Sequence, residues 1–160
     1  MPKTIRISLT NESINSAIKE VQRYKRWVLE KEKELRSRLA SLGATVASIE
    51  FSRAIYNGTK DVSVRVDDTG SVAVIYAEGE SVAFIEFGSG IKYGYGHPQA
   101  GEHGMGPGTY PGKGNWDNEK GWWYGHGQHS YGNPPAMAMY DAVQKMTEEL
   151  TRIAREVFSA

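Results

Sequence analysis

Cysteine is absent from the sequence, and so are an excess of charge of one sign and any long apolar run. Without cysteine the chain has no disulfide scaffold, no thiolate zinc site and no cysteine nucleophile. The 19 basic residues balance the 19 acidic residues, whereas a nucleic-acid binder that relies on phosphate contacts is expected to show a basic excess. A neutral chain also lacks long-range repulsion between its copies, which permits self-association.

No apolar stretch approaches the roughly 18 residues that a membrane span requires, so we expect no membrane partner. The N-terminal residues Met-Pro-Lys-Thr-Ile-Arg lack the apolar region of a signal peptide, which predicts a chain made in a cytoplasm and not exported by its own signal. The 160 residues, 39% hydrophobic and 24% charged, suit one folded domain over residues 1–160 with an ordinary core.

The first zone, up to about residue 57, predicts a short strand followed by a long helix over residues 11–56. Ile5, Ile7 and Leu9 alternate with polar residues as in a strand, and Thr10 or Asn11 can cap the helix. Gly43 lies inside the helix and indicates a kink or a break. The helix carries an apolar heptad row that forms one stripe along it, at Ile14, Val21, Val28, Leu35, Leu42 and Ile49.

The polar face of this helix is rich in cations, among them Lys31, Lys33, Arg36 and Arg38. Glutamates interleave with these cations, which favours a solvated face over nucleic-acid contact. A second apolar row is interrupted by Lys25 and by a glutamate, which favours packing on a sheet or a neighbour over a coiled coil.

The second zone predicts a β-hairpin over residues 61–77. Two alternating apolar runs flank Asp67-Asp68-Thr69-Gly70, a turn with glycine where a left-handed residue is needed. The segment 81–88 is too short to assign from periodicity alone, and we prefer a two-turn helix that Ser81 caps and Gly88 ends over a third strand. At the C-terminus, Asn133-Pro134-Pro135 resembles a cap followed by a proline start, and an amphipathic helix over 134–158 follows, its stripe covering the hairpin sheet. The layout is α+β, with the long N-terminal and C-terminal helices packed on a small antiparallel sheet.

The third zone, the loop over residues 88–133, differs in composition from the rest of the chain. It holds 14 of the 18 glycines, all four histidines and three of the four tryptophans, with no helix or strand period. Loops longer than about 12–15 residues are uncommon in compact domains and tend to be functional or disordered. One chain's loop can hardly bury so many large rings on itself, so we expect a partner surface to cover them.

The residues we expect at such a contact are aromatic. They are Trp116, Trp122, Trp123, Tyr124 and Tyr110 in the loop, with Phe84 and Phe87 before it. The alternative is that the tryptophans stack on sugar rings, as in a glycan-binding module. We favour a subunit interface, because binding modules usually mount such rings on a rigid sheet.

Other chemistry has weaker support in the sequence. A metal-dependent hydrolase could draw ligands from His97, His103, His126 and His129 with Glu102, Asp117 or Glu119, but no regular element would hold them. The glycine clusters lack the spacing of a phosphate-binding loop. Without a nucleophile elbow or a triad we expect no enzyme activity and no cofactor.

The segment Ala83-Phe84-Ile85-Glu86-Phe87-Gly88-Ser89-Gly90 resembles a signature of the phage neck and tail-completion proteins, the putative tail-component family of siphophages. In that family an aromatic-hydrophobic-Glu-aromatic-Gly-Thr/Ser-Gly segment follows a β-hairpin, and a proline-rich step opens the C-terminal helix. Here that step is Asn133 to Met137, and Thr109-Tyr110-Pro111-Gly112-Lys113 looks like a segment of some prophage members. The loop between is longer and more aromatic than in the family pattern.

The resemblance implies a non-catalytic structural protein of the virion, assembled in the bacterial host cytoplasm. It implies a homo-oligomeric ring at the head–tail junction that contacts the portal or head-completion protein on one side and tail proteins on the other. DNA would be present only as the contents of the channel, which Lys31, Lys33, Arg36 or Arg38 would line. Neither a cofactor nor a metal is implied.

Overall fold

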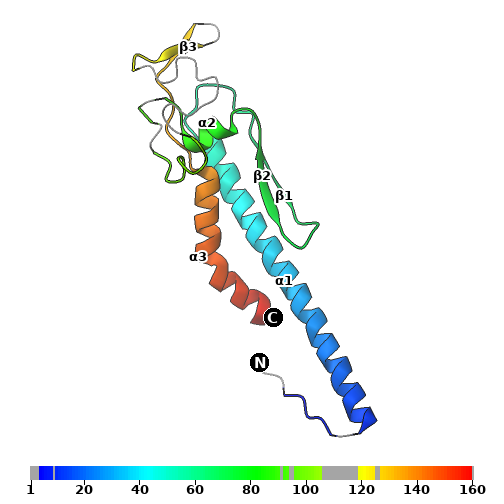
Figure 1. Cartoon of the computed structure of the whole chain (residues 1–160). Coiled ribbons are helices and arrows are strands. Elements are labelled where there is room, and N and C mark those ends of the chain that lie inside the picture. Colours follow the sequence, from blue (N-terminus) through cyan, green and yellow to red (C-terminus); the bar gives the residue numbers. More distant parts are fainter. Residues whose placement is uncertain are drawn as a thin grey trace.

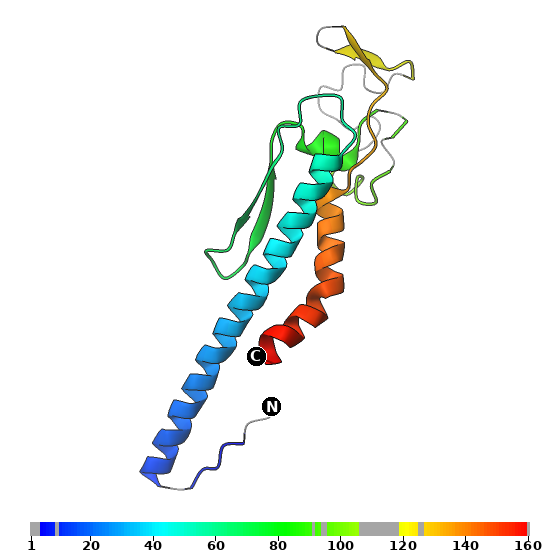
Figure 2. The ribbon, with the colours of Figure 1, turned by 180° about the vertical axis from the view of Figure 1, so that it is seen from behind.

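The computed structural model describes residues 4–8, 10–90, 92–93, 96–105, 119–124 and 127–159. It confirms an α+β fold built on one long helix (Figure 1). Helix α1 lies between the β1–β2 hairpin on one side and α3 on the other, in both views of the molecule (Figure 2). The elements in chain order are α1 (Asn11–Arg53), β1 (Ser63–Asp67), β2 (Val74–Glu78), α2 (Val82–Phe87), β3 (Trp122–Tyr124), β4 (Gln128–Ser130) and α3 (Ala138–Ser159).

Helix α1 begins where the sequence predicts and ends slightly earlier. The Thr10 side chain accepts a hydrogen bond from the backbone N–H of Ser13, which confirms it as the N-cap. The predicted end at residue 56 is wrong, because the chain turns to extended backbone at Ala54. The Lys60 ammonium donates to the carbonyl of Ser52 at 3.0 Å and so satisfies one of the orphan carbonyls of this end. The predicted strand before α1 is absent from residues 4–8, where the Ser8 N–H donates to the Ser13 hydroxyl.

Gly43 neither kinks nor breaks α1, contrary to the prediction. The helix continues through it, and Gly43 is buried. A Cβ atom at this position would lie 2.6 Å from both Cδ1 of Ile75 and Sδ of Met146. The glycine therefore lets the hairpin and α3 approach α1 from two sides at the same level.

The β1–β2 hairpin forms, with Ser63 opposite Glu78 and Asp67 opposite Val74. The predicted tight turn at residues 67–70 is wrong, since the strands are joined by the longer loop 68–73 and Gly70 does not adopt the left-handed region. Two contacts explain this loop. The Asp67 carboxylate accepts hydrogen bonds from Thr69, and the Arg36 guanidinium of α1 donates to the carbonyls of Gly70 and Ser71.

Helix α2 matches the predicted short helix and ends at Gly88, which has φ 77°. Its start differs from the prediction, because the Ser81 side chain makes no cap hydrogen bond to the helix. The Asp61 carboxylate instead accepts from the N–H groups of Glu80 and Ser81 and from the Ser81 hydroxyl. These hydrogen bonds, that from the Ser81 side chain first, hold the pKa of Asp61 below its usual value.

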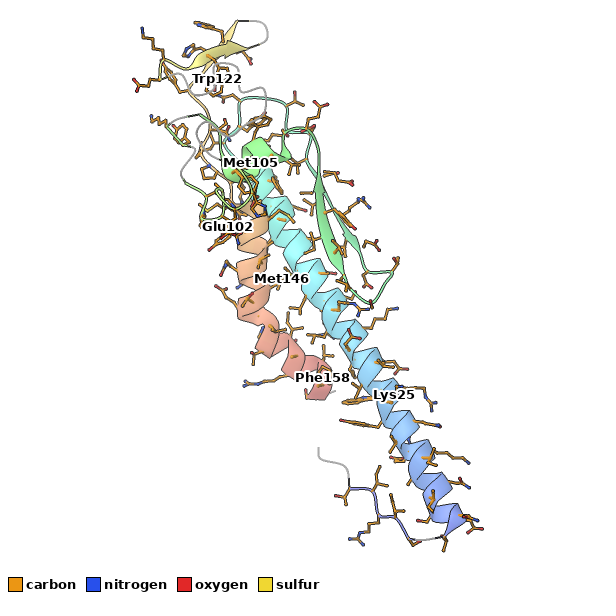
Figure 3. All side chains as sticks on the ribbon, in the orientation of Figure 1. Lys25, Glu102, Met105, Trp122, Met146 and Phe158 are labelled. Carbon is orange, nitrogen blue, oxygen red and sulfur yellow. The ribbon has the colours of Figure 1, made fainter. Side chains whose placement is uncertain are left out.

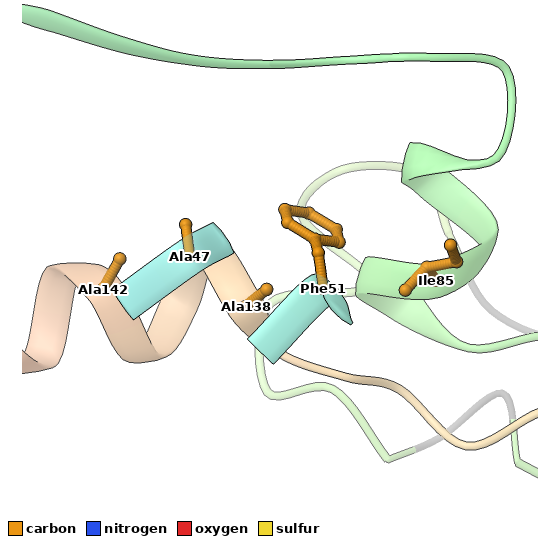
Figure 4. Close-up of a cluster of buried hydrophobic side chains, with 5 residues drawn as sticks. All are labelled: Ala47, Phe51, Ile85, Ala138 and Ala142. Atoms are coloured by element: carbon orange, nitrogen blue, oxygen red, sulfur yellow. The ribbon is translucent and has the colours of Figure 1, made fainter. Parts of the chain in front are cut away.

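Helix α3 begins at Ala138, not at residue 134, and packs on α1 rather than on the hairpin sheet. The helix cannot start earlier, because Met137 has φ 53°, in the left-handed region, while Ala136 and Met137 donate their N–H groups to the carbonyls of Ile85 and Glu86 in α2. Small side chains on both helices allow close packing around Phe51 and Ile85. The core cluster is Ala47, Phe51, Ile85, Ala138 and Ala142 (Figure 4).

The loop over 88–133 contains regular structure, contrary to the prediction from its composition. It includes the short β3–β4 hairpin, in which Trp122 lies opposite Ser130 and Trp123 opposite His129. An isolated antiparallel bridge between Ser89 and Asn133 closes the base of the loop. Both views place β3–β4 at one end of the molecule and the N-terminal end of α1 at the other (Figures 1 and 2).

Candidate interaction surface

The predicted contact residues divide between two places in the structure. Trp122, Trp123 and Tyr124 form β3, whereas Phe84 and Phe87 lie on α2. Tyr110 and Trp116 lie outside the described residues. The structure therefore does not bring the predicted set together as one platform within the part of the chain that it describes.

Strand β3 separates its tryptophans, because successive side chains of a strand point to opposite faces. Trp122 is partly buried, whereas the Trp123 side chain is 71% exposed. The Trp123 ring meets the His129 ring edge to face at 4.7 Å between centroids, and His129 meets Tyr131 in the same way at 4.7 Å. Trp123, His129 and Tyr131 thus form a short ridge of rings, which we call the Trp123 ridge.

The two phenylalanines of α2 have different surroundings. Phe84 is exposed to a substantial extent, as an interaction surface requires. Phe87 is half-buried, and its ring lies 4.6 Å from that of His97 and 5.4 Å from that of His103. Phe87 therefore contributes to the packing of the loop onto α2.

Glu86, which was not among the predicted contact residues, is a buried carboxylate that caps α3. Its oxygens accept hydrogen bonds from the N–H groups of Met139 (2.9 Å) and Tyr140 (3.1 Å), in the first turn of α3. A carboxylate at this position also interacts favourably with the helix dipole. The signal in the sequence is that Glu86 is the one charged residue in the apolar segment 82–87.

His97 completes the surroundings of Glu86. Its Nε2 lies 3.3 Å from Oε1 of Glu86, and both side chains are buried. Its Nδ1 accepts a hydrogen bond from the N–H of Gln99, so the ring proton belongs on Nε2, which donates to Glu86. Hydrogen bonds within the fold therefore hold both ring nitrogens of His97, and the residue is not positioned as a metal ligand.

Ser89 and Asn133 join the two ends of the loop, and we call their contacts the Ser89–Asn133 clasp. Their backbones exchange two hydrogen bonds of 2.9 and 3.1 Å, and the Ser89 hydroxyl donates to the Asn133 side-chain oxygen. The Asn133 amide also donates to the carbonyl of Phe84 at 2.8 Å. The segment 84–90 is therefore a joint that holds α2, the base of the loop and the approach to α3.

The second exposed apolar surface lies on the N-terminal half of α1. Ile14, Ile18 and Val21 repeat at helical spacing on one face, and each is 40–55% exposed. We call these three residues the α1 stripe. Phe158 at the end of α3 meets the Trp27 ring at 5.9 Å, and the part of α1 before Trp27, with Lys25, extends beyond α3 (Figure 3).

The cations predicted to line a channel are largely paired along α1. Lys31 and Arg38 both contact Glu34, and Arg36 contacts Glu32 as well as the hairpin loop. Lys33 is exposed. These contacts match the interpretation of this face as a solvated, ion-paired helix surface.

Among the described residues no group of three or more His, Asp or Glu side chains is placed to hold a metal ion. His126 and Asp117, two of the ligands considered for a hydrolase, lie outside those residues. In the described part of the chain, no helix combines the length and the apolar character of a membrane span.

No protein-family model matches this sequence, and no curated protein or solved structure matches it either. The chain's own surfaces are therefore the basis for a functional proposal. Two of those surfaces, the α1 stripe and the Trp123 ridge, expose large apolar side chains at opposite ends of the molecule.

Proposed function

We propose that this chain is a structural virion protein of a tailed phage or prophage and forms a ring at the head–tail junction. The observation that carries the proposal is the α1 stripe, a row of aliphatic side chains that are each 40–55% exposed in the described part of the chain. Fully burying one such side chain is worth about 1.5–3 kcal/mol, so a partner that covers the stripe gains several favourable contacts. Exposed apolar rows of this kind mark protein–protein interaction sites.

The elongated shape fits a subunit with contacts at both ends. The Trp123 ridge lies at the end opposite to the N-terminus of α1, which makes it the second contact in this proposal (Figure 1). Tryptophan and tyrosine are enriched among the residues that dominate binding energy at interfaces. In this arrangement, one end of the subunit contacts a sister copy, and the other contacts the portal, a head-completion protein or a tail protein.

The resemblance of segment 84–90 to neck and tail-completion proteins supports the same proposal. In this chain the segment builds the Glu86 cap and the Ser89–Asn133 clasp. A joint of this kind fixes the position of the loop relative to α3, which a docking surface needs. The proposed role requires neither catalysis nor a cofactor.

A glycan-binding module is the second candidate, and the placement of the Trp123 ridge favours it more than the sequence did. The ridge stands on a hairpin, and exposed rings on a strand can stack on sugar faces. Under this alternative the chain stays monomeric and sediments with cell-wall polymer. Under the proposal, it does not sediment with the polymer.

The proposal is tested by deleting the coding sequence from its phage and supplying the chain from a plasmid. We expect the deletion to give DNA-filled heads and separate tails by electron microscopy, and the wild-type chain to restore joined particles. Trp123→Ala should restore them poorly, although its folding is unchanged, because an exposed ring contributes little to stability. Joined, infectious particles without the chain would contradict the proposal.

A further inference from the structure

The α1 stripe has an electrostatic counterpart on the same molecule. Residues 11–29 of α1 contain four basic and two acidic side chains, whereas residues 61–80 around the hairpin contain five acidic side chains and one basic. The formal charge is therefore about +2 for the first region and −4 for the second, with Arg23 paired to Glu20 in α1 and Arg65 paired to Glu78 in the hairpin. Such a division favours association of unlike regions of neighbouring copies.

The hairpin also exposes apolar side chains beside its acidic residues. Val64 and Ala77 pack on the core, so the alternation of the strands points Val74 and Tyr76 away from α1. Val72, Val74 and Tyr76 are all at least 37% exposed, and together we call them the hairpin face. Asp67 lies beside this face, and hydrogen bonds from Thr69 hold the pKa of its carboxyl group below the usual value. The Asp67 carboxylate therefore stays charged down to acidic pH.

The two surfaces cannot meet within one chain. Gly43 lies against Ile75 of β2, and Val21 is roughly 22 residues earlier on the same unbroken helix. At a rise of 1.5 Å per residue these levels of α1 are about 33 Å apart, and the hairpin loop, which contacts Arg36, still lies about 22 Å along α1 from Val21. A contact between the surfaces must therefore join two molecules.

We propose that the α1 stripe of one copy packs on the hairpin face of a second copy, with Lys25 of the first beside the acidic hairpin loop of the second. The assignment of this contact to the ring rests on the proposed function. Because the two surfaces differ, the contact is heterologous, and its repetition closes a ring when the rotation between copies allows. Lys25 continues the stripe, since it follows Val21 by four residues.

The absence of cysteine permits a test in the full-length chain without background. Val21→Cys and Val74→Cys are made in separately tagged copies, mixed in equal amounts and oxidised. Val21 is 55% exposed and Val74 is 40% exposed, so both variants should fold. A disulfide requires Cα atoms within about 7 Å, which the intrachain separation forbids. In the matched control, Lys19→Cys replaces Val21→Cys. Lys19 lies about 120° around α1 from Lys25 and is therefore off the α1 stripe.

We expect the Val21→Cys and Val74→Cys copies to form a mixed disulfide at least about tenfold faster than the control pair, and a chain with both changes to form a ladder of linked copies. A mixed disulfide no faster than the control overturns the inference, and so does a predominance of Val21–Val21 links. If mass photometry then still shows closed oligomers, or particles still require the chain, the ring proposal survives with a different contact. A mixed disulfide in a chain that its phage does not need for joining would support the contact and refute the proposed function.

Discussion

Glu86→Ala is expected to lower the free energy of unfolding by about 3–5 kcal/mol, because it removes the acceptor of several buried donors. The N–H groups of Met139 and Tyr140 and the Nε2–H of His97 all point to this carboxylate. Each buried donor left without an acceptor costs about 1–3 kcal/mol, so the loss of several together accounts for the expected effect. Denaturation in urea, followed by circular dichroism, measures the change.

Two further variants separate the cap from general effects of substitution. Glu86→Gln keeps the shape and one acceptor oxygen, so about half of the loss should be recovered. Glu80→Ala, at an exposed position before α2, should change stability by no more than about 0.5 kcal/mol. Equal unfolding midpoints for Glu86→Ala and Glu80→Ala would show that the carboxylate does not cap α3.

Gly132→Ala is expected to destabilise the chain by about 3 kcal/mol or more through the Ser89–Asn133 clasp. Gly132 has φ 98°, and a Cβ atom there would overlap the backbone carbonyl of Ser89. The backbone must shift to admit the methyl group, and the two hydrogen bonds between Ser89 and Asn133 are lost with that shift. Thermal unfolding by calorimetry gives the size of the effect.

Gly127→Ala is the matched control for this prediction. Gly127 has φ 78°, but a Cβ atom there would meet nothing within 4 Å. It should therefore cost only the penalty of a left-handed alanine, about 1–2 kcal/mol. If Gly132→Ala is no worse than Gly127→Ala, the close approach at the clasp is not important for stability.

The long helices were predictable from the sequence because their apolar rows are periodic and their caps are local. Thr10 caps α1 as its residue type indicates. The start of α3 was predicted four residues too early, since the proline step pairs with α2 and not with its own helix. The tertiary pairing outweighs the local preference of Asn133 and Pro134 for a helix start.

The partner of each helix face was less predictable than the helices themselves. Periodicity shows that α3 has an apolar face, but not whether a sheet or a helix covers it. Gly43 illustrates the difficulty, because its residue type indicates a helix break and its actual role is the close approach of Ile75 and Met146. Only the three-dimensional arrangement distinguishes these two uses of a glycine.

The candidate surface was predicted only in part, because composition locates aromatic residues without orienting them. Trp122 and Trp123 are neighbours in the sequence but point to opposite faces of β3, and Trp123 is the more exposed. The α1 stripe was visible as periodicity, yet its exposure depends on where α3 ends, near Trp27. Glu86 was visible as part of the signature, but its role as a cap depends on α3.

The presence of this chain in the particle is measured most directly by cryo-electron microscopy of the purified virions. The proposal predicts a closed ring of copies around the channel where head meets tail, with the β3–β4 hairpin and the N-terminal half of α1 both covered by neighbours. Virions in which that junction is built entirely of other proteins would contradict it.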